Sequence, residues 1–331
     1  MLHQKPLLVT FVMLVDRIPM TASPKKRGPG RPKVYPDRLI VKALIIMVLR
    51  RLYTAYSLLA FLDQDTPLTR ELSTLLTDEQ GHFPSRRTWE RRLKALPDSL
   101  PGLIGALGRY LVCLIQPWAH QGRAAALDST ALRANGGVWH KKHREQGIVP
   151  HTSIDTEAHW SKSGHHGWWY GWKLHLACTV ASVWIPLAAK LTAAHVHDNV
   201  PAPDLIRELP FEARYVLGDN HYNAPHVRAQ CQLSHRWLVA SGRGPYPHTD
   251  PGVDVRRTLH LLRHQAIEPF NGLFKNVFEW GGQVPVKGLN RTQLIVLGAV
   301  LLYQLALLYQ FEHGKPLAQG RVNYDHPSAN Y

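Results

Sequence analysis

Two stretches of this 331-residue chain, AAALDSTAL at residues 124–132 and RYVLGDN at residues 214–220, decide the fold class. Each holds a short apolar run of strand-like length, and an aspartate closes each run, Asp128 in the first and Asp219 in the second. A short apolar run bounded by polar or turn residues is typical of a buried strand. Both stretches therefore predict buried strands that end in a carboxylate.

The residues around these runs alternate between strand and helix patterns. Further strand-like runs occupy residues 172–180, 185–194 and 236–244, and helical pieces occupy residues 202–209 and 224–233. Strands that alternate with helices favour an α/β core over an all-β sandwich. We therefore expect an α/β fold with a sheet flanked by helices.

The composition is that of a globular protein with excess positive charge. Lys and Arg number 39 against 24 Asp and Glu, which gives a net charge of +15 with His neutral. Hydrophobic residues make up 45% of the chain, which excludes disorder throughout. Three scattered cysteines exclude a disulfide framework and suit a reducing compartment. The charge favours a polyanionic partner, most simply nucleic acid, and a generically basic surface is the alternative.

Two apolar stretches raise the question of targeting or membrane insertion. Residues 6–15 look like the core of a signal peptide, but a basic cluster and no small-residue cleavage site follow. Residues 294–311 contain Gln304 and Gln310, which makes them marginal for a membrane span and typical of a buried helix. We therefore expect no membrane association; a membrane-associated protein is the alternative, based on residues 294–311 alone.

A third carboxylate, Glu268, lies in the helical stretch HQAIEPFNGLFKNVF. Lys275 follows it by two helical turns, so the two side chains share a helix face. Three carboxylates on rigid elements suit hard cations such as Mg²⁺, and two such ions can support a displacement at phosphorus. Taken singly, each acid has an ordinary alternative: a turn cap for Asp128, a turn start for Asp219 and a solvated helix position for Glu268.

Five motifs in a fixed order resemble the DDE transposases of bacterial insertion sequences. They are ALDST (126–130), WKLHLACTV (172–180), AAHVHDN (193–199), YVLGDNHYN (215–223) and IEPFNGLFK (267–275). The basic stretch GRPKVYPDRLIVKALI also resembles the entry to the N-terminal domain of that family. The resemblance covers about residues 28–312, and the ordered set is specific although each motif alone is weak.

The resemblance implies a ribonuclease-H-like catalytic core preceded by an all-helical DNA-binding region. It implies that Asp128, Asp219 and Glu268 form a catalytic, metal-binding triad for two Mg²⁺ or Mn²⁺ ions. It implies cleavage and strand transfer at the terminal inverted repeats of an insertion sequence, with double-stranded DNA as partner at both transposon ends and target. It also implies a homodimer or higher assembly on DNA, and a cytoplasmic, nucleoid-associated protein of a bacterium.

The changes in pattern and the resemblance together divide the chain. We expect a basic mobile arm (1–33), a helical DNA-binding region (34–117), a ribonuclease-H-like catalytic domain (118–290), a buried C-terminal helix (291–312) and a polar tail (313–331). Within the catalytic domain, residues 136–167 are rich in His, Lys, Gly and Ser and predict a long mobile loop.

The candidate DNA contacts are basic or aromatic residues in three places. They are Lys275, Arg263, Lys173 and Trp172 near the triad, Arg86, Arg87 and Arg91 in the stretch 85–96, and Lys25, Lys26, Arg27, Arg31 and Lys33 in the arm. The stretch 85–96 is either a recognition helix or a solvated amphipathic helix with Trp89 in the core. The aromatic loop HHGWWYGWKLH either stacks on bases or covers the sheet edge.

The segment around Glu268 departs from one branch of the family, which has Tyr, two residues, Arg, three residues, Glu, six residues, Lys. Leu261 and His264 stand at the Tyr and Arg positions, and Arg263 lies one residue early. Pro269 predicts either a helix that begins near residue 269 or a longer helix with a kink.

Three further interpretations stay open. The AHVHDN motif could bind zinc through His195, His197 and Asp198, but a role in structuring the loop or supporting the site is favoured, because no partner cluster accompanies it. A ribonuclease-H-like nuclease without strand transfer would share the triad. A relative that binds DNA without catalysis would keep the fold, and the presence of all three carboxylates argues against it.

Overall fold

The apolar runs between residues 124 and 240 form one six-stranded mixed sheet in the computed structural model of the chain. The structure describes residues 6–20, 35–118, 123–164, 167–180, 183–240, 253–278 and 283–317. The strands are β1 (Ala124–Arg133), β2 (His159–Ser163), β3 (Gly167–Thr179), β4 (Pro186–Ala193), β5 (Tyr215–Gly218) and β6 (Trp237–Ala240). Helices flank this sheet, so the α/β fold class is confirmed.

The register of the sheet brings the two aspartates to neighbouring positions. β3 pairs antiparallel with β1, β2 and β4, and β5 and β6 extend the sheet parallel to β1 in the order β2-β3-β1-β5-β6. Ala126 of β1 pairs with Leu217 of β5. Asp128 and Asp219 each come two residues after this pair on parallel strands. The two carboxylates are therefore placed side by side by the backbone alone.

Two predicted loops are regular structure instead. The aromatic stretch at 165–175 was expected to be a loop, but β3 begins at Gly167 and pairs with β2 from that residue on. The long loop predicted at 136–167 contains α7 (Lys141–Glu145) and β2. Gly171 allows β3 to pair closely with β1 on its other side, because a Cβ there would lie 2.1 Å from the carbonyl oxygen of Leu132 in β1.

The chain before the sheet is helical, and hydroxyl side chains begin several of its helices. The helices are α1 (Leu7–Leu14), α2 (Asp37–Arg50), α3 (Ala55–Leu62), α4 (Pro67–Leu75), α5 (Arg86–Ala95) and α6 (Leu100–Ile115). Thr54, Thr66 and Ser85 accept hydrogen bonds from backbone N–H groups in the first turns of α3, α4 and α5. Residues 6–15, which resemble a signal core in the sequence, lie largely in α1, a helix with four buried residues that packs on α2, α4 and α11.

The C-terminal helix α11 (Leu289–Glu312) joins the helical region to the sheet. It packs against α1, α2, α6 and β4, so one hydrophobic core runs through both parts of the chain. By length and apolar composition α11 could cross a membrane, and two bent helix pairs, α2 with α3 and α5 with α6, pass the same test. However, 89% of the apolar window in α11 is buried inside the protein. Gln304 is satisfied there because its amide donates to the carbonyls of Ile104 (2.8 Å) and Pro186 (2.7 Å).

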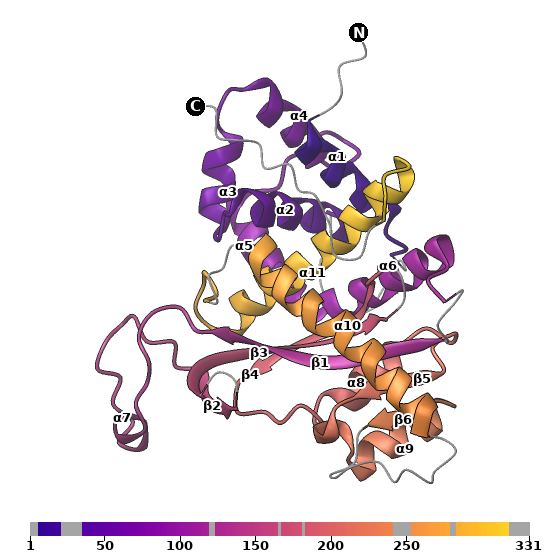
Figure 1. The fold of residues 1–331 in the computed structure, drawn as a ribbon. Helices are drawn as coiled ribbons and strands as arrows, with labels where there is room; N and C mark the ends of the chain where they lie inside the picture. The colour runs from indigo at the N-terminus through magenta and orange to yellow at the C-terminus, as the bar shows by residue number, and fades with distance from the viewer. Residues whose placement is uncertain are drawn as a thin grey trace, which may run out of the picture.

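The remaining helices cover the sheet, and α10 carries the third carboxylate. α8 (Ala202–Glu208) packs on β3 and β4, and α9 (Pro225–Leu233) packs on β6. α10 (Val253–Val277) crosses the front of the sheet over β1, β5 and β6 (Figure 1). α10 continues on both sides of Pro269, so the prediction of a helix that begins there is wrong. Buried Ile267 and Phe270 anchor the helix to the core on either side of the proline.

The basic residues of the predicted N-terminal arm lie outside the described residues. They are Lys25, Lys26, Arg27, Arg31 and Lys33. Most of the predicted polar tail, from residue 318 on, also lies outside them.

Candidate active site

Asp128 lies on β1 under α10, and two side chains of that helix bind it. Its side chain is 18% exposed. The Arg263 guanidinium donates to Asp128 Oδ1 at 3.3 Å, and the Asn271 amide donates to Asp128 Oδ2 at 3.0 Å. Both carboxylate oxygens of Asp128 are therefore oriented by groups from one helix.

Glu268 is linked to Asp128 through the same guanidinium. Arg263 Nη1 lies 3.4 Å from Glu268 Oε1, while its Nη2 reaches Asp128. His264 Nδ1 lies 2.6 Å from the same Glu268 oxygen. Arg263 is only 4% exposed, so it forms a buried positive centre between two acids. The Arg predicted as a DNA contact is therefore placed inside the carboxylate cluster.

Asp219 directly follows β5 and begins a tight turn. Its Oδ1 accepts a hydrogen bond from the His221 backbone N–H at 2.8 Å, which caps the 3-10 turn Asn220–Tyr222. The turn packs back on Gly218, where a Cβ would lie 2.8 Å from the Tyr222 side chain. Asp219 thus has the turn-starting role that was its ordinary alternative, and the same turn fixes its carboxylate at the end of the strand.

The three carboxylates are close enough to influence one another. Burial raises the pKa of Asp128 to about 6, Arg263 opposes this rise, and the charges of Asp219 and Glu268 add to it. A low-dielectric position favours the neutral acid, and like charges nearby act in the same direction. A bound cation would reverse both effects, since it would favour three ionised ligands.

This environment predicts a pH-dependent stability that belongs to Asp128. Between about pH 4 and about pH 6 the folded protein holds a proton on Asp128 that the unfolded chain releases, so this group's contribution to stability falls as pH rises. Without divalent ions, we expect the free energy of unfolding of Asp128→Asn to rise relative to that of wild type as pH increases. The change should reach up to about 3 kcal/mol between about pH 4 and about pH 7. Urea unfolding of both proteins across this range measures the difference, and parallel stability profiles would contradict the assignment.

The carboxylates and Asn271 offer the oxygen donors that a hard divalent ion needs, although the Arg263 guanidinium lies between two of the carboxylates. Within the described ranges, no three His, Cys, Asp or Glu side chains are grouped as a ready metal cage. The available donors are the oxygens of Asp128, Asp219 and Glu268, together with Asn271 Oδ1, which is buried and has no hydrogen-bond partner among the described residues. Oxygen donors fit Mg²⁺ and Mn²⁺. The guanidinium supplies the positive charge that a metal would otherwise bring.

A polar network behind the site contains the aspartate of the AHVHDN motif. Asp198 Oδ1 accepts hydrogen bonds from Ser129 Oγ and Lys173 Nζ, both at 2.9 Å, and His175 Nδ1 lies 3.8 Å away. Asp198 therefore ties its loop to β1 and β3, which supports a structuring role over zinc binding. Lys173, predicted to contact DNA, has its ammonium group engaged by Asp198 and by the Val196 carbonyl.

Another predicted DNA contact is wrong. The Trp172 side chain is fully buried, because β3 is covered on both faces over most of its length, so its ring cannot stack on a base. Trp168, in the same aromatic stretch, is 65% exposed instead. Lys275 is half-buried on α10, burial lowers its pKa, and no ion pair of its ammonium is seen among the described residues.

The structure also adds residues that the sequence analysis did not single out. Asn271 lies one helical turn after Glu268, and this spacing could have placed it on the same face of α10. The Tyr222 hydroxyl is buried beside the acids and lacks a hydrogen-bond partner within the part of the chain that the structure describes. Burial and then the charges of Asp198, Asp128 and Asp219 raise the Tyr222 pKa, so its phenol stays neutral.

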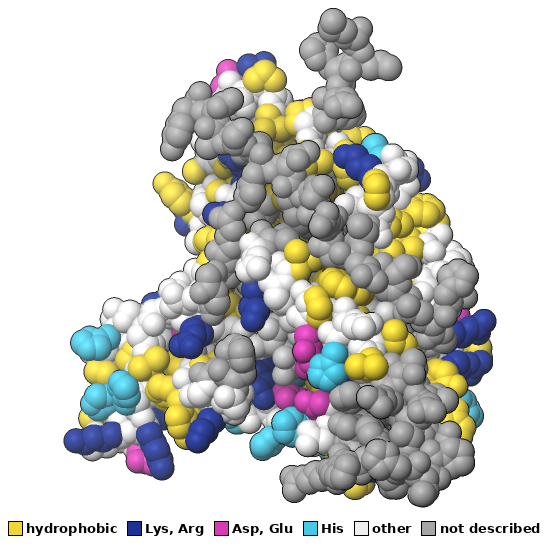
Figure 2. Space-filling model, viewed as in Figure 1, with side chains coloured by type: hydrophobic (Ala, Val, Ile, Leu, Met, Phe, Trp, Pro, Cys, Tyr) yellow, Lys and Arg dark blue, Asp and Glu magenta, His cyan; other side chains and the backbone are white. Residues whose placement is uncertain are grey.

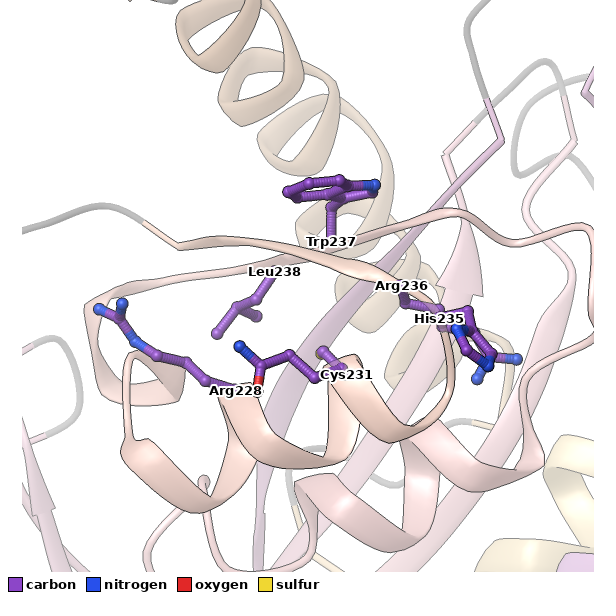
Figure 3. Close-up of a pocket in the computed structure, with 7 residues that line it drawn as sticks. Arg228, Cys231, His235, Arg236, Trp237 and Leu238 are labelled. Carbon is purple, nitrogen blue, oxygen red and sulfur yellow. The ribbon is translucent and has the colours of Figure 1, made fainter.

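A separate pocket lies between α9 and β6, and none of the three carboxylates lines it (Figure 3). Arg228, Cys231, His235 and Trp237 are among its lining residues. Arg236 also lines it, but its guanidinium donates to backbone carbonyls of residues 209, 210 and 213 and so holds a loop in place. Among the described residues, no acid lines this pocket, so the pocket does not resemble a site for cation chemistry.

The order of the acids, their positions on the sheet and α10, and their shared environment define a carboxylate-based enzyme of the DDE type. A family profile described as "Transposase DDE domain" matches residues 119–305, more than half of the chain, and the chain belongs to that family. This confirms the family suggested by the five motifs. The chain is also similar to an uncharacterized protein of Aquifex aeolicus (strain VF5), with 24% identity over 294 residues, 84% of this chain and 79% of that protein. No solved structure shows a significant match.

Membership of this family has three general consequences. Its enzymes are transposases, their substrate is DNA, and they generally use divalent metal ions.

Proposed function

We propose that this chain is a transposase that binds the terminal inverted repeats of its own insertion sequence, cuts DNA at their ends and joins the freed 3′-hydroxyl to target DNA. The observation that carries the proposal is the convergence of Asp128 and Glu268 on Arg263, with Asp219 two residues beyond the β1–β5 pair. The parallel extension of the sheet by β5 and β6 beyond antiparallel β1, β3 and β4 supports a ribonuclease-H-like core.

The proposed roles follow from the chemistry of each side chain. Asp128, Asp219 and Glu268 would hold two Mg²⁺ or Mn²⁺ ions, which would activate water or the 3′-hydroxyl and stabilise the leaving oxygen. Asn271 orients Asp128 through its amide. Lys275, on the same helix as Glu268, would neutralise a phosphate beside the cut, because a lysine ammonium is a compact point charge.

The helical region is proposed to bind the repeats, and α5 is its best candidate contact. Trp89 of α5 is fully buried, while Arg87, Arg91 and Lys94 are exposed at helical spacing on another face. Arg86 is held by Glu90 at 2.8 Å and lies over the Tyr56 ring. The two interpretations of this helix are therefore compatible, since the tryptophan anchors it and the arginines remain available for DNA.

The proposed activity is tested with DNA that directly flanks the reading frame. Duplexes from both sides are incubated with the protein, Mg²⁺ and a supercoiled target plasmid, and nicked and joined products are mapped. Nicks at the repeat ends followed by joining support the transposase. Nicking without joining would favour the nuclease without strand transfer, and binding alone would favour a relative without catalysis. We also propose that the protein acts as a homodimer or larger assembly on paired ends. Its proposed location is cytoplasmic and nucleoid-associated, without membrane association.

DNA affinity is expected to fall steeply with salt. A chain with a net charge of +15 releases counterions when it neutralises phosphates, so log affinity falls linearly with log salt. Replacing the five basic residues of the arm with Ala, which leaves the buried helix α1 intact, should reduce both the slope and the affinity while Mg²⁺-dependent nicking of bound DNA persists; these residues are Lys25, Lys26, Arg27, Arg31 and Lys33. Fluorescence anisotropy from about 50 to about 200 mM salt measures the slope. An affinity that does not change with salt would contradict the electrostatic account.

Lys275→Ala is expected to weaken binding of the cleaved transposon end by about 1–3 kcal/mol, the usual cost of a lost charge-assisted contact. Strand transfer should slow in parallel, whereas metal binding should not change. Lys315→Ala, an exposed lysine near the end of α11, is the charge control. Equally small effects at both positions would rule out the phosphate contact at Lys275.

A further inference from the structure

Residues 135–158, between β1 and β2, form a projection that the proposed chemistry does not use; we name it the finger. Figure 1 shows it extending away from the sheet, with α7 near its tip. α7 contains no buried residue, so it contributes nothing to the core. A segment of this kind costs conformational entropy to order, which favours a role outside folding.

The finger is anchored at its base by hydrogen bonds to the segment before α11. Asn135 Nδ2 donates to the Pro285 carbonyl at 2.8 Å, and Lys287 Nζ donates to the Thr152 carbonyl at 2.8 Å. The Gly288 backbone N–H donates to Asp155 at 2.9 Å. The finger is therefore held in a defined direction from the sheet.

Aromatic contacts shape the tip of the finger. Trp139 Nε1 donates to the Ile148 carbonyl, and Trp160 Nε1 donates to the Trp139 carbonyl, both at 2.8 Å. The Arg144 guanidinium lies over the Trp139 ring at 5.5 Å. These contacts fix the short helix α7 and the cations that it carries.

The charge of the finger is concentrated where it is exposed. Lys141 and Lys142 are exposed and adjacent on α7, and Lys162 of β2 lies over the exposed ring of Trp168 at 5.6 Å. The finger's one acid on α7, Glu145, pairs weakly with Lys141 at 3.6 Å. The two other acids of the finger, Asp155 and Glu157, lie at its base, where they accept hydrogen bonds from the backbone N–H groups of residues 288 and 289. The acids at the base are therefore held away from the lysines of α7.

The tip of the finger, α7, and the helix that carries Glu268, α10, are both visible in the view of Figure 1. Figure 2 shows acidic side chains in the middle of this face, with Lys, Arg and His side chains gathered to their lower left, over the region of α7. The N-terminal helices lie above the sheet in the same view (Figure 1). DNA held by those helices and cut at the acids could continue toward the finger.

We propose that the finger is a sequence-independent clamp for the backbone of the double-stranded DNA that lies beyond the cut, outside the inverted repeat. This inference rests on the proposed function. The DNA beyond an element's end differs at every insertion site, so only phosphate contacts could bind it each time. Lysine ammonium groups on flexible stems suit phosphates and carry no base specificity.

The test compares duplexes that do and do not extend past the cut. One duplex holds the repeat alone, a second adds about 20 base pairs of natural flank, about two helical turns, and a third adds unrelated flank of equal length. Wild type is expected to bind both extended duplexes equally and more tightly than the repeat alone. Lys141→Glu with Lys142→Glu should bind the repeat as wild type does and lose the gain from either flank, about tenfold, with a salt slope smaller by about 2.

The matched control reverses two exposed charges elsewhere, Arg207→Glu on α8 with Lys315→Glu after α11. The proposal would be overturned if the finger variant still bound the extended duplexes more tightly than the repeat alone. It would also be overturned if the control variant lost as much of this gain in affinity as the finger variant. Wild-type nicking at the repeat end is followed in the same samples. Normal nicking with an unchanged flank gain refutes the finger alone, whereas absent nicking in wild type refutes the proposed function.

A second measurement does not depend on the double variant. Lys142→Cys, in a Cys113→Ser background that removes the exposed native thiol, carries a photo-crosslinker on the finger. Crosslinks to the flank side of the cut are expected. Crosslinks only within the repeat, or only to a second copy of the chain, would overturn the assignment to flanking DNA.

Discussion

Asp128→Ala, Asp219→Ala and Glu268→Ala are each expected to abolish DNA cleavage while DNA binding is retained. The expected loss is about a thousandfold or more, the scale on which enzymes depend on groups that act on the reacting atoms. The reason is geometric: Asp128, in the middle of β1, lies beside Asp219, which follows the parallel strand β5, and Glu268 shares a guanidinium with Asp128. No described cation other than Arg263 bonds to both Asp128 and Glu268.

Cleavage of end-containing duplexes in Mg²⁺ or Mn²⁺, beside binding measured in EDTA, separates catalysis from affinity. Asp204→Ala is the matched control, because this exposed carboxylate on α8 pairs with Lys190 and Arg207 away from the triad. The isosteric Asp128→Asn and Asp219→Asn should behave like the alanine variants. Substantial metal-dependent cleavage by any triad variant would remove that residue from the catalytic set.

Arg263→Met is expected to destabilise the metal-free protein by about 3 kcal/mol, because removing one partner of a buried ion pair leaves an uncompensated charge. The value is set at the low end of the usual range, since Glu268 is half-exposed. Saturating Mg²⁺ or Mn²⁺ should recover most of this loss, because a bound cation would neutralise the same carboxylates. Urea unfolding in EDTA and in excess divalent ion measures both values.

Arg236→Met provides the control for this experiment. Arg236 is also partly buried, but it donates to backbone carbonyls beneath β6 and contacts none of the three acids. The loss of stability caused by Arg236→Met should be the same in EDTA and in Mg²⁺. If Arg263→Met showed the same independence from metal, the guanidinium and the cation would not share the acids, and the proposed metal position would be wrong.

Much of the candidate site followed from local sequence. The apolar runs at 124–132 and 214–220 predicted two strands, and the structure places Asp128 and Asp219 at neighbouring positions, although β1 continues past Asp128 to Arg133. This prediction was possible because the apolar pattern of a buried strand lies within a few consecutive residues. The spacing of Glu268 and Lys275 placed both on one helix for the same reason.

The identity of the bridging cation depended on tertiary packing. Arg263 and His264 are adjacent on α10, and neighbouring helix residues point about 100° apart. Which of them faces Asp128 is set by the rotation of the helix, and the buried anchors Ile267, Phe270 and Phe274 decide that rotation. No local pattern around residue 264 contains this information.

The sequence by itself therefore predicted the α/β class, every strand of the six-stranded sheet except β2, and the three candidate acids, because each depends on neighbours in the chain. Only the tertiary structure decided what covers each strand and where each cation points. Trp172 looked like a surface ring in a loop, but β3 is covered on both faces and buries it. Lys173 looked free to bind DNA, but Asp198 lies beside it in the folded protein. Both outcomes depend on contacts between distant segments, and the free energy of such contacts is absent from any local pattern.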